Sequence, residues 1–142
     1  MKIFSNQPGL VVSSVSDVEK QAFSVFENLV EVHFVSRNDS LPFVNRYATP
    51  HTLGVDRMVN AAGATLQFPN QNRLVIDAGT CVTYDFIDES NNYLGGAISP
   101  GLQLRYAALH NFTAKLPLLE LENPEYFIGK STPESIHSGV VN

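Results

Sequence analysis

The stretch "LVIDAGTCVTYDF", residues 74–86, decides how the second half of the chain folds. Two runs rich in β-branched and aromatic residues flank residues 77–80, and each run has the composition of a strand. Asp77 and Gly79 between such strands are ordinary in a tight β-turn. The same residues can also form a phosphate-binding loop, because backbone N–H groups and the Thr80 hydroxyl can point into the turn. The stretch by itself leaves both interpretations open.

Before this stretch, the spacing of apolar residues predicts two strands and two helices. They are strands at 10–15 and 30–36, helices at 18–29 and 54–68, and a proline-containing loop at 37–53. Asp17 is the expected N-cap of the first helix, which should bury one face. Gly63 lies inside the second helix, where it either weakens the prediction or marks a close helix contact.

The second half predicts three successive strands and two more helices. The strands are 73–80, 81–90 and 93–101, and a helix over 102–116 places Leu102, Tyr106, Leu109 and Phe112 on one stripe. A last helix is expected to begin with Thr132 as N-cap and Pro133 at its first position. The order of elements indicates an α/β fold that is incomplete at both ends, as in a fragment.

Composition excludes several classes of protein. The chain has 142 residues and a formal net charge of −5, without a run of Lys and Arg, so we expect no nucleic-acid partner. No apolar stretch approaches the ~18 residues of a membrane span. The single cysteine, Cys81, and the absence of a signal peptide fit a cytoplasmic protein. The four histidines lack the spacing of zinc ligands.

Two further stretches admit both a functional and an ordinary interpretation. In "HTLGVDR", residues 51–57, Asp56 suits the first turn of a helix, but Arg57 does not. An aspartate beside an arginine could act as general base for an alcohol while the arginine holds a carboxylate. In "YLGGAISPGLQL", residues 93–104, the glycines suggest either a close backbone approach or an anion site at the following helix start.

Taken together and in order, these segments resemble the type III pantothenate kinases. The segments are "VVSSV", Tyr47 followed by "PHTLGVDRMVNAAGA", "LVIDAGTCVTYDFI", "YLGGAISPGLQLRYAAL", "TAKLP" and "GKSTPESIHSG". The resemblance implies the ribonuclease H-like, actin-like ATPase fold, with mixed sheets and flanking helices. It implies that residues 1–68 complete a first subdomain, ending in the linking helix, and that residues 69–142 begin a second. It also favours the phosphate loop over the plain turn at residues 77–80.

The resemblance implies a role for each candidate site residue. Asp56 would be the general base toward the pantothenate hydroxyl, and Thr80 would contact the phosphates of ATP. Asp77 would hold a monovalent cation, K⁺ or NH₄⁺, while a divalent cation such as Mg²⁺ would accompany ATP. The pantothenate site would be lined by Tyr47, Gly54, Val55, Asp56, Arg57 and Thr132.

The resemblance further implies a homodimer in which residues 111–113 help complete the partner's pantothenate pocket. The expected reaction is ATP-dependent phosphorylation of pantothenate to 4'-phosphopantothenate, the first step of coenzyme A biosynthesis. The family's first phosphate loop has no counterpart in this sequence, so we expect a partial, weakly active or inactive piece. The alternative is a non-catalytic, regulatory homologue of the same fold that binds a nucleotide or a partner.

Overall fold

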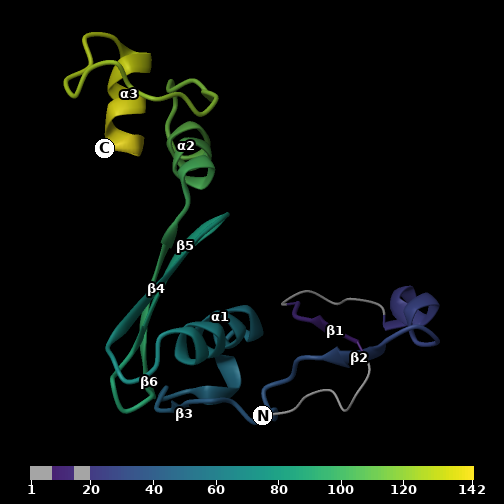
Figure 1. Cartoon of the computed structure of the whole chain (residues 1–142). Coiled ribbons are helices and arrows are strands. Elements are labelled where there is room, and N and C mark those ends of the chain that lie inside the picture. The colour runs from purple at the N-terminus through teal and green to yellow at the C-terminus, as the bar shows by residue number, and fades with distance from the viewer. Residues whose placement is uncertain (1–7, 15–19) are drawn as a thin grey trace. The chain divides into compact units, whose positions relative to one another are not determined.

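The structure, a computed structural model, describes residues 8–14 and 20–142 (Figure 1). Contacts divide the chain into two compact units, the first within Met1–Val75 and Asp85–Gly96, the second within Ile76–Tyr84 and Ala97–Asn142. This division does not follow the predicted subdomain boundary at residue 68, which stays a prediction. Among the described residues, no helix has the length and apolar character needed to cross a membrane.

The first unit begins with two short parallel strands. Strand β1 (Gly9–Val12) pairs with β2 (Glu31–Phe34), and Leu10 lies opposite Val32. Both strands overlap the ranges that the sequence predicts, and the residues of β1 alternate between exposed and half-buried. Parallel pairing requires a crossover connection, and the described part of this connection contains the 3-10 helix η1 (Lys20–Phe26).

The prediction of a helix with one buried face over 18–29 is wrong for the described residues. They form the 3-10 helix η1, and only Phe23 among residues 21–29 is half-buried, against the ring of Phe34. Val25 and Leu29 are exposed, so no apolar face packs on a core and stabilises an α-helix. The predicted N-cap, Asp17, lies outside the described residues.

Helix α1 (Val55–Gln67) confirms the helix predicted over 54–68, and it carries the core of the first unit. The core cluster is Phe43, Leu53, Val55, Met58, Ala61, Ile87 and Tyr93. Gly63 is exposed, and a Cβ placed on it would meet no atom of the described residues within 4 Å. The interpretation of Gly63 as a close helix contact is therefore wrong.

The predicted loop 37–53 contains two short elements that the sequence pattern did not reveal. They are strand β3 (Val44–Asn45) and the 3-10 helix η2 (Pro50–Thr52). Strand β3 is only two residues long and pairs in parallel with β6, with Val44 opposite Asn92. Such a short strand shows no alternation, so only its long-range partner defines it.

The three strands predicted after residue 72 are confirmed as β4 (Arg73–Ala78), β5 (Cys81–Ile87) and β6 (Asn92–Pro100). The sheet order is β3-β6-β5-β4, and the short turns make β4, β5 and β6 antiparallel neighbours. Arg73, at the start of β4, joins the turn between β5 and β6 to the end of α1. Its buried guanidinium donates to the Phe68 carbonyl oxygen at 3.0 Å, to Asn91 Oδ1 at 2.8 Å and to the Asp88 carbonyl oxygen.

The second unit contains helices α2 (Leu102–Asn111) and α3 (Thr132–Val141). Tyr106, Ile136 and Val140 form its core. Helix α2 ends earlier than the predicted residue 116, and Phe112 is 87% exposed instead of completing the buried stripe. The cap of α3 is Ser131, not Thr132, because the Ser131 side chain accepts a hydrogen bond from the Glu134 backbone N–H.

The turn between β4 and β5 rests on the backbone of Gly101. The Gly101 N–H donates to the Thr80 carbonyl oxygen at 2.9 Å. A Cβ on Gly101 would lie 2.1 Å from the Gly79 carbonyl oxygen, which no real structure tolerates. The glycine before α2 is therefore explained by close backbone approach.

We expect Gly101→Ala to destabilise the chain by about 1–3 kcal/mol, since backbone atoms of the turn must move to admit the methyl group. Gly63→Ala is the matched control, because its Cβ meets no neighbour and α1 gains about 0.5–1 kcal/mol from the better helix former. Thermal unfolding of both variants measures the contrast. Equal shifts in Tm would contradict the described packing of Gly101.

Candidate functional site

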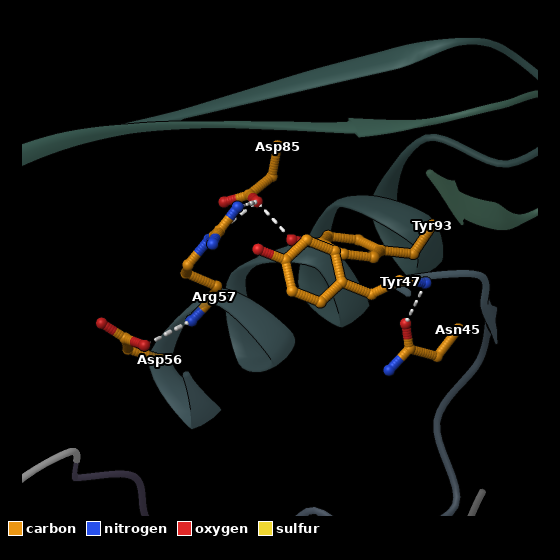
Figure 2. A network of polar contacts seen from close by, with 6 residues as sticks. All are labelled: Asn45, Tyr47, Asp56, Arg57, Asp85 and Tyr93. Atoms are coloured by element: carbon orange, nitrogen blue, oxygen red, sulfur yellow. Dashed lines mark hydrogen bonds and ion pairs between the residues drawn. The ribbon is translucent and has the colours of Figure 1, made fainter. Parts of the chain in front are cut away.

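A buried ion pair joins the first turn of α1 to β5 in the first unit (Figure 2). The Arg57 guanidinium donates to Asp85 Oδ1 through Nη2 at 2.6 Å and through Nε at 2.9 Å. The Tyr93 hydroxyl donates to the same oxygen at 2.5 Å. Arg57 is 7% exposed, Asp85 1% and Tyr93 0%, so water does not screen these contacts.

The pKa values of this cluster follow from burial and charge. Burial by itself would lower the pKa of Arg57, but hydrogen bonds and Coulomb attraction to Asp85 outweigh burial and raise it. Burial, and then the hydrogen bond to the Asp85 carboxylate, raises the pKa of the Tyr93 hydroxyl well above its ordinary value. Arg57 is therefore a fixed cation and Tyr93 a fixed neutral donor over the working pH range.

Tyr47, in the loop before α1, lies against Arg57 and Tyr93. The centre of its ring lies 5.8 Å from Arg57 Cζ and 6.1 Å from the Tyr93 ring centre. The Asn45 side chain accepts the Tyr47 backbone N–H at 2.9 Å, which fixes the local chain. Gly95 lies under the Tyr47 ring with a φ of +108°, and a Cβ there would approach the ring to 3.3 Å. The positive φ requires a glycine at position 95, and the Tyr47 ring adds a close contact.

Asp56 lies beside this cluster at the start of α1. Gly54 is the N-cap, and the buried residues Val55 and Arg57 hold the backbone on the two sides of Asp56. The Asp56 carboxylate is half-buried and accepts the Arg57 backbone N–H at 2.8 Å. The structure therefore brings Tyr47, Asp56 and Arg57 together, as a shared site requires.

A cleft of about 850 Å³ opens in the same unit, at the carboxyl ends of the parallel strands β1 and β2. Its lining includes Ser14, Ser36, Asp39, His51 and Val55. Ligands of open α/β sheets bind at this end of parallel strands. A hydrogen bond with His33 lowers the pKa of the Asp39 carboxyl, which keeps one negative charge at the cleft wall.

The predicted phosphate loop belongs to the second unit, where Asp77 and Thr80 are both exposed. Asp77 is the second-last residue of β4, and Thr80 lies in the two-residue connection to β5. The Gly79 N–H donates to the Cys81 carbonyl oxygen at 2.9 Å. Gly79 has an ordinary φ, and a Cβ on it would meet only one backbone oxygen at 3.9 Å. Neither strain nor crowding within the chain requires this glycine, which leaves room for a close ligand.

The remaining candidates also lie in the second unit. Thr132 is exposed at the first position of α3 and lines a cavity of about 720 Å³ together with Lys130 and Ser135. Residues 111–113 end α2 and are exposed, and the Thr113 hydroxyl donates to the Leu109 carbonyl oxygen at 2.7 Å. Within residues 8–14 and 20–142, no group of three or more His, Cys, Asp or Glu side chains is placed to hold a metal ion.

The sequence analysis missed Asp85 and Tyr93 as members of the cluster. The available signal was the alternation along β5, in which Thr83, Asp85 and Ile87 share one phase. A charged residue in the inward phase of a strand requires a buried partner. The sequence alone assigns Arg57 to a substrate carboxylate and gives no sign that its partner is Asp85, 28 residues later in the chain.

Comparison with solved structures supports the architecture. A protein from Campylobacter jejuni, described as a conserved putative Baf family transcriptional activator, matches 96% of this chain and 60% of its own with a TM-score of 0.56. The two sequences are 21% identical, so the likeness shows a shared fold only.

Comparison with curated proteins is more specific. The type III pantothenate kinase of Flavobacterium johnsoniae is 68% identical over 139 residues, which is 98% of this chain and 57% of that protein. The type III pantothenate kinase of Flavobacterium psychrophilum is 62% identical over 133 residues, which is 94% of this chain and 55% of that protein. The chain thus spans little more than half the length of these relatives.

The sheets and flanking helices form part of an actin-like ATPase fold, which is the fold of the family whose model matches the chain. The family model for type III pantothenate kinase matches residues 2–142, and the chain belongs to that family. The fold class and the resemblance inferred from the sequence are confirmed.

We expect Arg57→Ala to destabilise the fold by about 3–5 kcal/mol, since it leaves the Asp85 carboxylate buried without its cation. Arg46→Ala is the matched control in the same unit, because Arg46 is exposed and its bond to Asn92 should contribute no more than about 1 kcal/mol. Chemical denaturation measures both losses. A small loss for Arg57→Ala would contradict the buried pair.

Proposed function

We propose that the whole protein transfers the γ-phosphoryl group of ATP to pantothenate, giving 4'-phosphopantothenate in the first step of coenzyme A biosynthesis. Membership of the type III pantothenate kinase family supports this reaction. The observation that carries it in the structure is the first turn of α1, where Asp56 directly precedes Arg57 and accepts its backbone N–H, while the Arg57 guanidinium lies over the Tyr47 ring. Because the chain spans only part of its relatives' length, the activity is proposed for the complete enzyme.

In the proposed reaction, Asp56 accepts the proton of the pantothenate hydroxyl. The hydroxyl oxygen forms a bond to the γ-phosphorus as the bond between that phosphorus and the β,γ-bridging oxygen breaks, and ADP leaves with the electron pair. The hydrogen bond from the Arg57 backbone N–H orients the Asp56 carboxylate and leaves its other oxygen for the substrate. Tyr47, Gly54, Val55 and Arg57 position the substrate, Arg57 by holding its carboxylate.

The turn at residues 77–80 is proposed to receive the phosphates of ATP. Its exposure and the open space at Gly79 fit a close approach by phosphate oxygens, which Thr80 can meet with its hydroxyl. The Asp77 carboxylate is a hard oxygen ligand suited to K⁺ or NH₄⁺ beside the phosphates. A divalent cation such as Mg²⁺ would arrive with ATP and neutralise charge on the transferred group.

The proposed enzyme is a cytoplasmic homodimer. Thr132 and residues 111–113 are exposed and therefore accessible to a pantothenate molecule bound at a subunit boundary. The alternative, a non-catalytic regulatory homologue, requires no proton acceptor at Asp56. The next experiment separates the two functions.

In a chain with the full length of the relatives, we expect Asp56→Asn to lower kcat by roughly 10²–10⁴-fold, because the amide cannot accept a proton. The KM for pantothenate should change less, since Arg57 still holds the substrate. If Asp56 were only a favourable charge at a helix start, the variant would lose about 0.3–1 kcal/mol of stability and keep its turnover. Measuring kcat and Tm on one preparation distinguishes these results, and unchanged kcat would remove the catalytic role.

We also expect turnover to depend on a monovalent cation held through Asp77. Rates in potassium or ammonium should exceed the rate in a buffer whose only cation is Tris, and Asp77→Asn should remove the difference. Glu89→Gln removes a carboxylate from the exposed turn after β5 and serves as a control that keeps the cation response. Equal wild-type rates in all buffers would exclude the cation.

A further inference from the structure

We propose that Asp85 and Tyr93 are positioning residues that select which edge of the Arg57 guanidinium faces the substrate carboxylate. The inference rests on the proposed function, because it concerns how the pantothenate site distinguishes a carboxylate from a neutral group. It starts from the buried cluster in Figure 2, in which Asp85 Oδ1 accepts bonds from both Arg57 and Tyr93.

The bonds to Asp85 use one edge of the guanidinium and leave the other. An arginine carries five N–H donors in one rigid plane. Asp85 takes the Nε–H and one donor of Nη2, which leaves two donors on Nη1 and one on Nη2, and the Tyr47 hydroxyl is a further hydrogen-bond partner of the guanidinium. One donor of Nη1 and the second donor of Nη2 point off the end of the side chain, the edge at which a carboxylate binds in a planar, two-bond geometry. Rotating the guanidinium would exchange the two edges and lose that geometry.

The Tyr93 hydroxyl holds the Asp85 carboxylate in place, and this carboxylate in turn holds the Arg57 guanidinium. The Tyr93 ring is fully buried between the core and Tyr47, and its hydroxyl donates to the oxygen that Arg57 uses. Removal of this hydroxyl frees Asp85 to turn about its side-chain bonds while every formal charge stays in place. Tyr93→Phe therefore changes the orientation of the pair without changing its charge.

A positioning role predicts an effect on one ligand and not on its neutral analogue. Pantothenate carries a carboxylate, and pantothenol carries a CH₂OH group at the same place. In the full-length enzyme, we expect Tyr93→Phe to weaken binding of pantothenate by roughly three- to tenfold, the range for one lost hydrogen bond. Binding of pantothenol should change less than twofold. Titration calorimetry measures both affinities without depending on turnover.

Two further variants show whether the effect passes through Arg57. Asp85→Glu keeps the charge and displaces the carboxylate, so it should also lower the preference for pantothenate over pantothenol. In an Arg57→Lys background, Tyr93→Phe should have no further effect on that preference, because the planar guanidinium is already lost. If Asp85→Glu does not fold, Tyr93→Phe still tests the proposal, because this variant adds no atoms to the core.

Arg73→Lys is the matched control for lost stability. Arg73 is 5% exposed, close to the 7% of Arg57, but its bonds go to Phe68, Asp88 and Asn91. This variant should lower Tm and keep the preference for pantothenate. A Tyr93→Phe enzyme that keeps the wild-type preference, or loses affinity for both ligands equally, would overturn the positioning role. A wild-type enzyme that binds pantothenate but does not phosphorylate it would instead overturn the proposed function alone.

Discussion

The buried contact between Arg57 and Asp85 is the constraint on which the first unit depends. Two charges with almost no exposure are stable only when they meet, so α1 must pack on β5 in one register. Tyr93 supplies a third bond to the shared oxygen, and this brings β6 into the same arrangement. The position of Asp56, one residue before Arg57, follows from this packing rather than from the charge of the helix start.

The same contact changes how Arg57 is understood in the reaction. An arginine that only held the substrate could be replaced with a loss of affinity alone. Here the guanidinium is the counter-ion of a buried carboxylate, so Arg57 has a structural role in addition to the substrate-binding role that we propose for it. Experiments on Arg57 therefore need a stability measurement beside each kinetic one, whereas Asp56 is half-buried and can be tested more directly.

The sequence predicted those elements whose pattern repeats over several turns or pleats. Helix α1 and strands β4, β5 and β6 were found because their apolar spacing is long and regular. Strand β3 and the pairing of Asp85 with Arg57 were not, because each depends on a partner distant in the chain. The prediction of a helix at 18–29 was wrong. An amphipathic helix needs a surface on which its apolar face packs, and most of the described apolar side chains in this segment are exposed. The resemblance grouped the site residues, and their assignment stays a prediction. The structure shows that Asp56 and Tyr47 both contact Arg57.

The glycine-rich segment from Tyr93 to Gly101 has a consequence for how sequence variation should be interpreted. Tyr93 is held by Asp85, Gly95 by the ring of Tyr47, and Gly101 by the backbone of the β4–β5 turn. Three different parts of the chain thus restrict strand β6 and the residue that follows it. A mutational scan would find this segment intolerant even in an assay that reports only folding. Intolerance here is evidence of steric fit, and evolutionary constancy of these positions would not by itself identify a catalytic group.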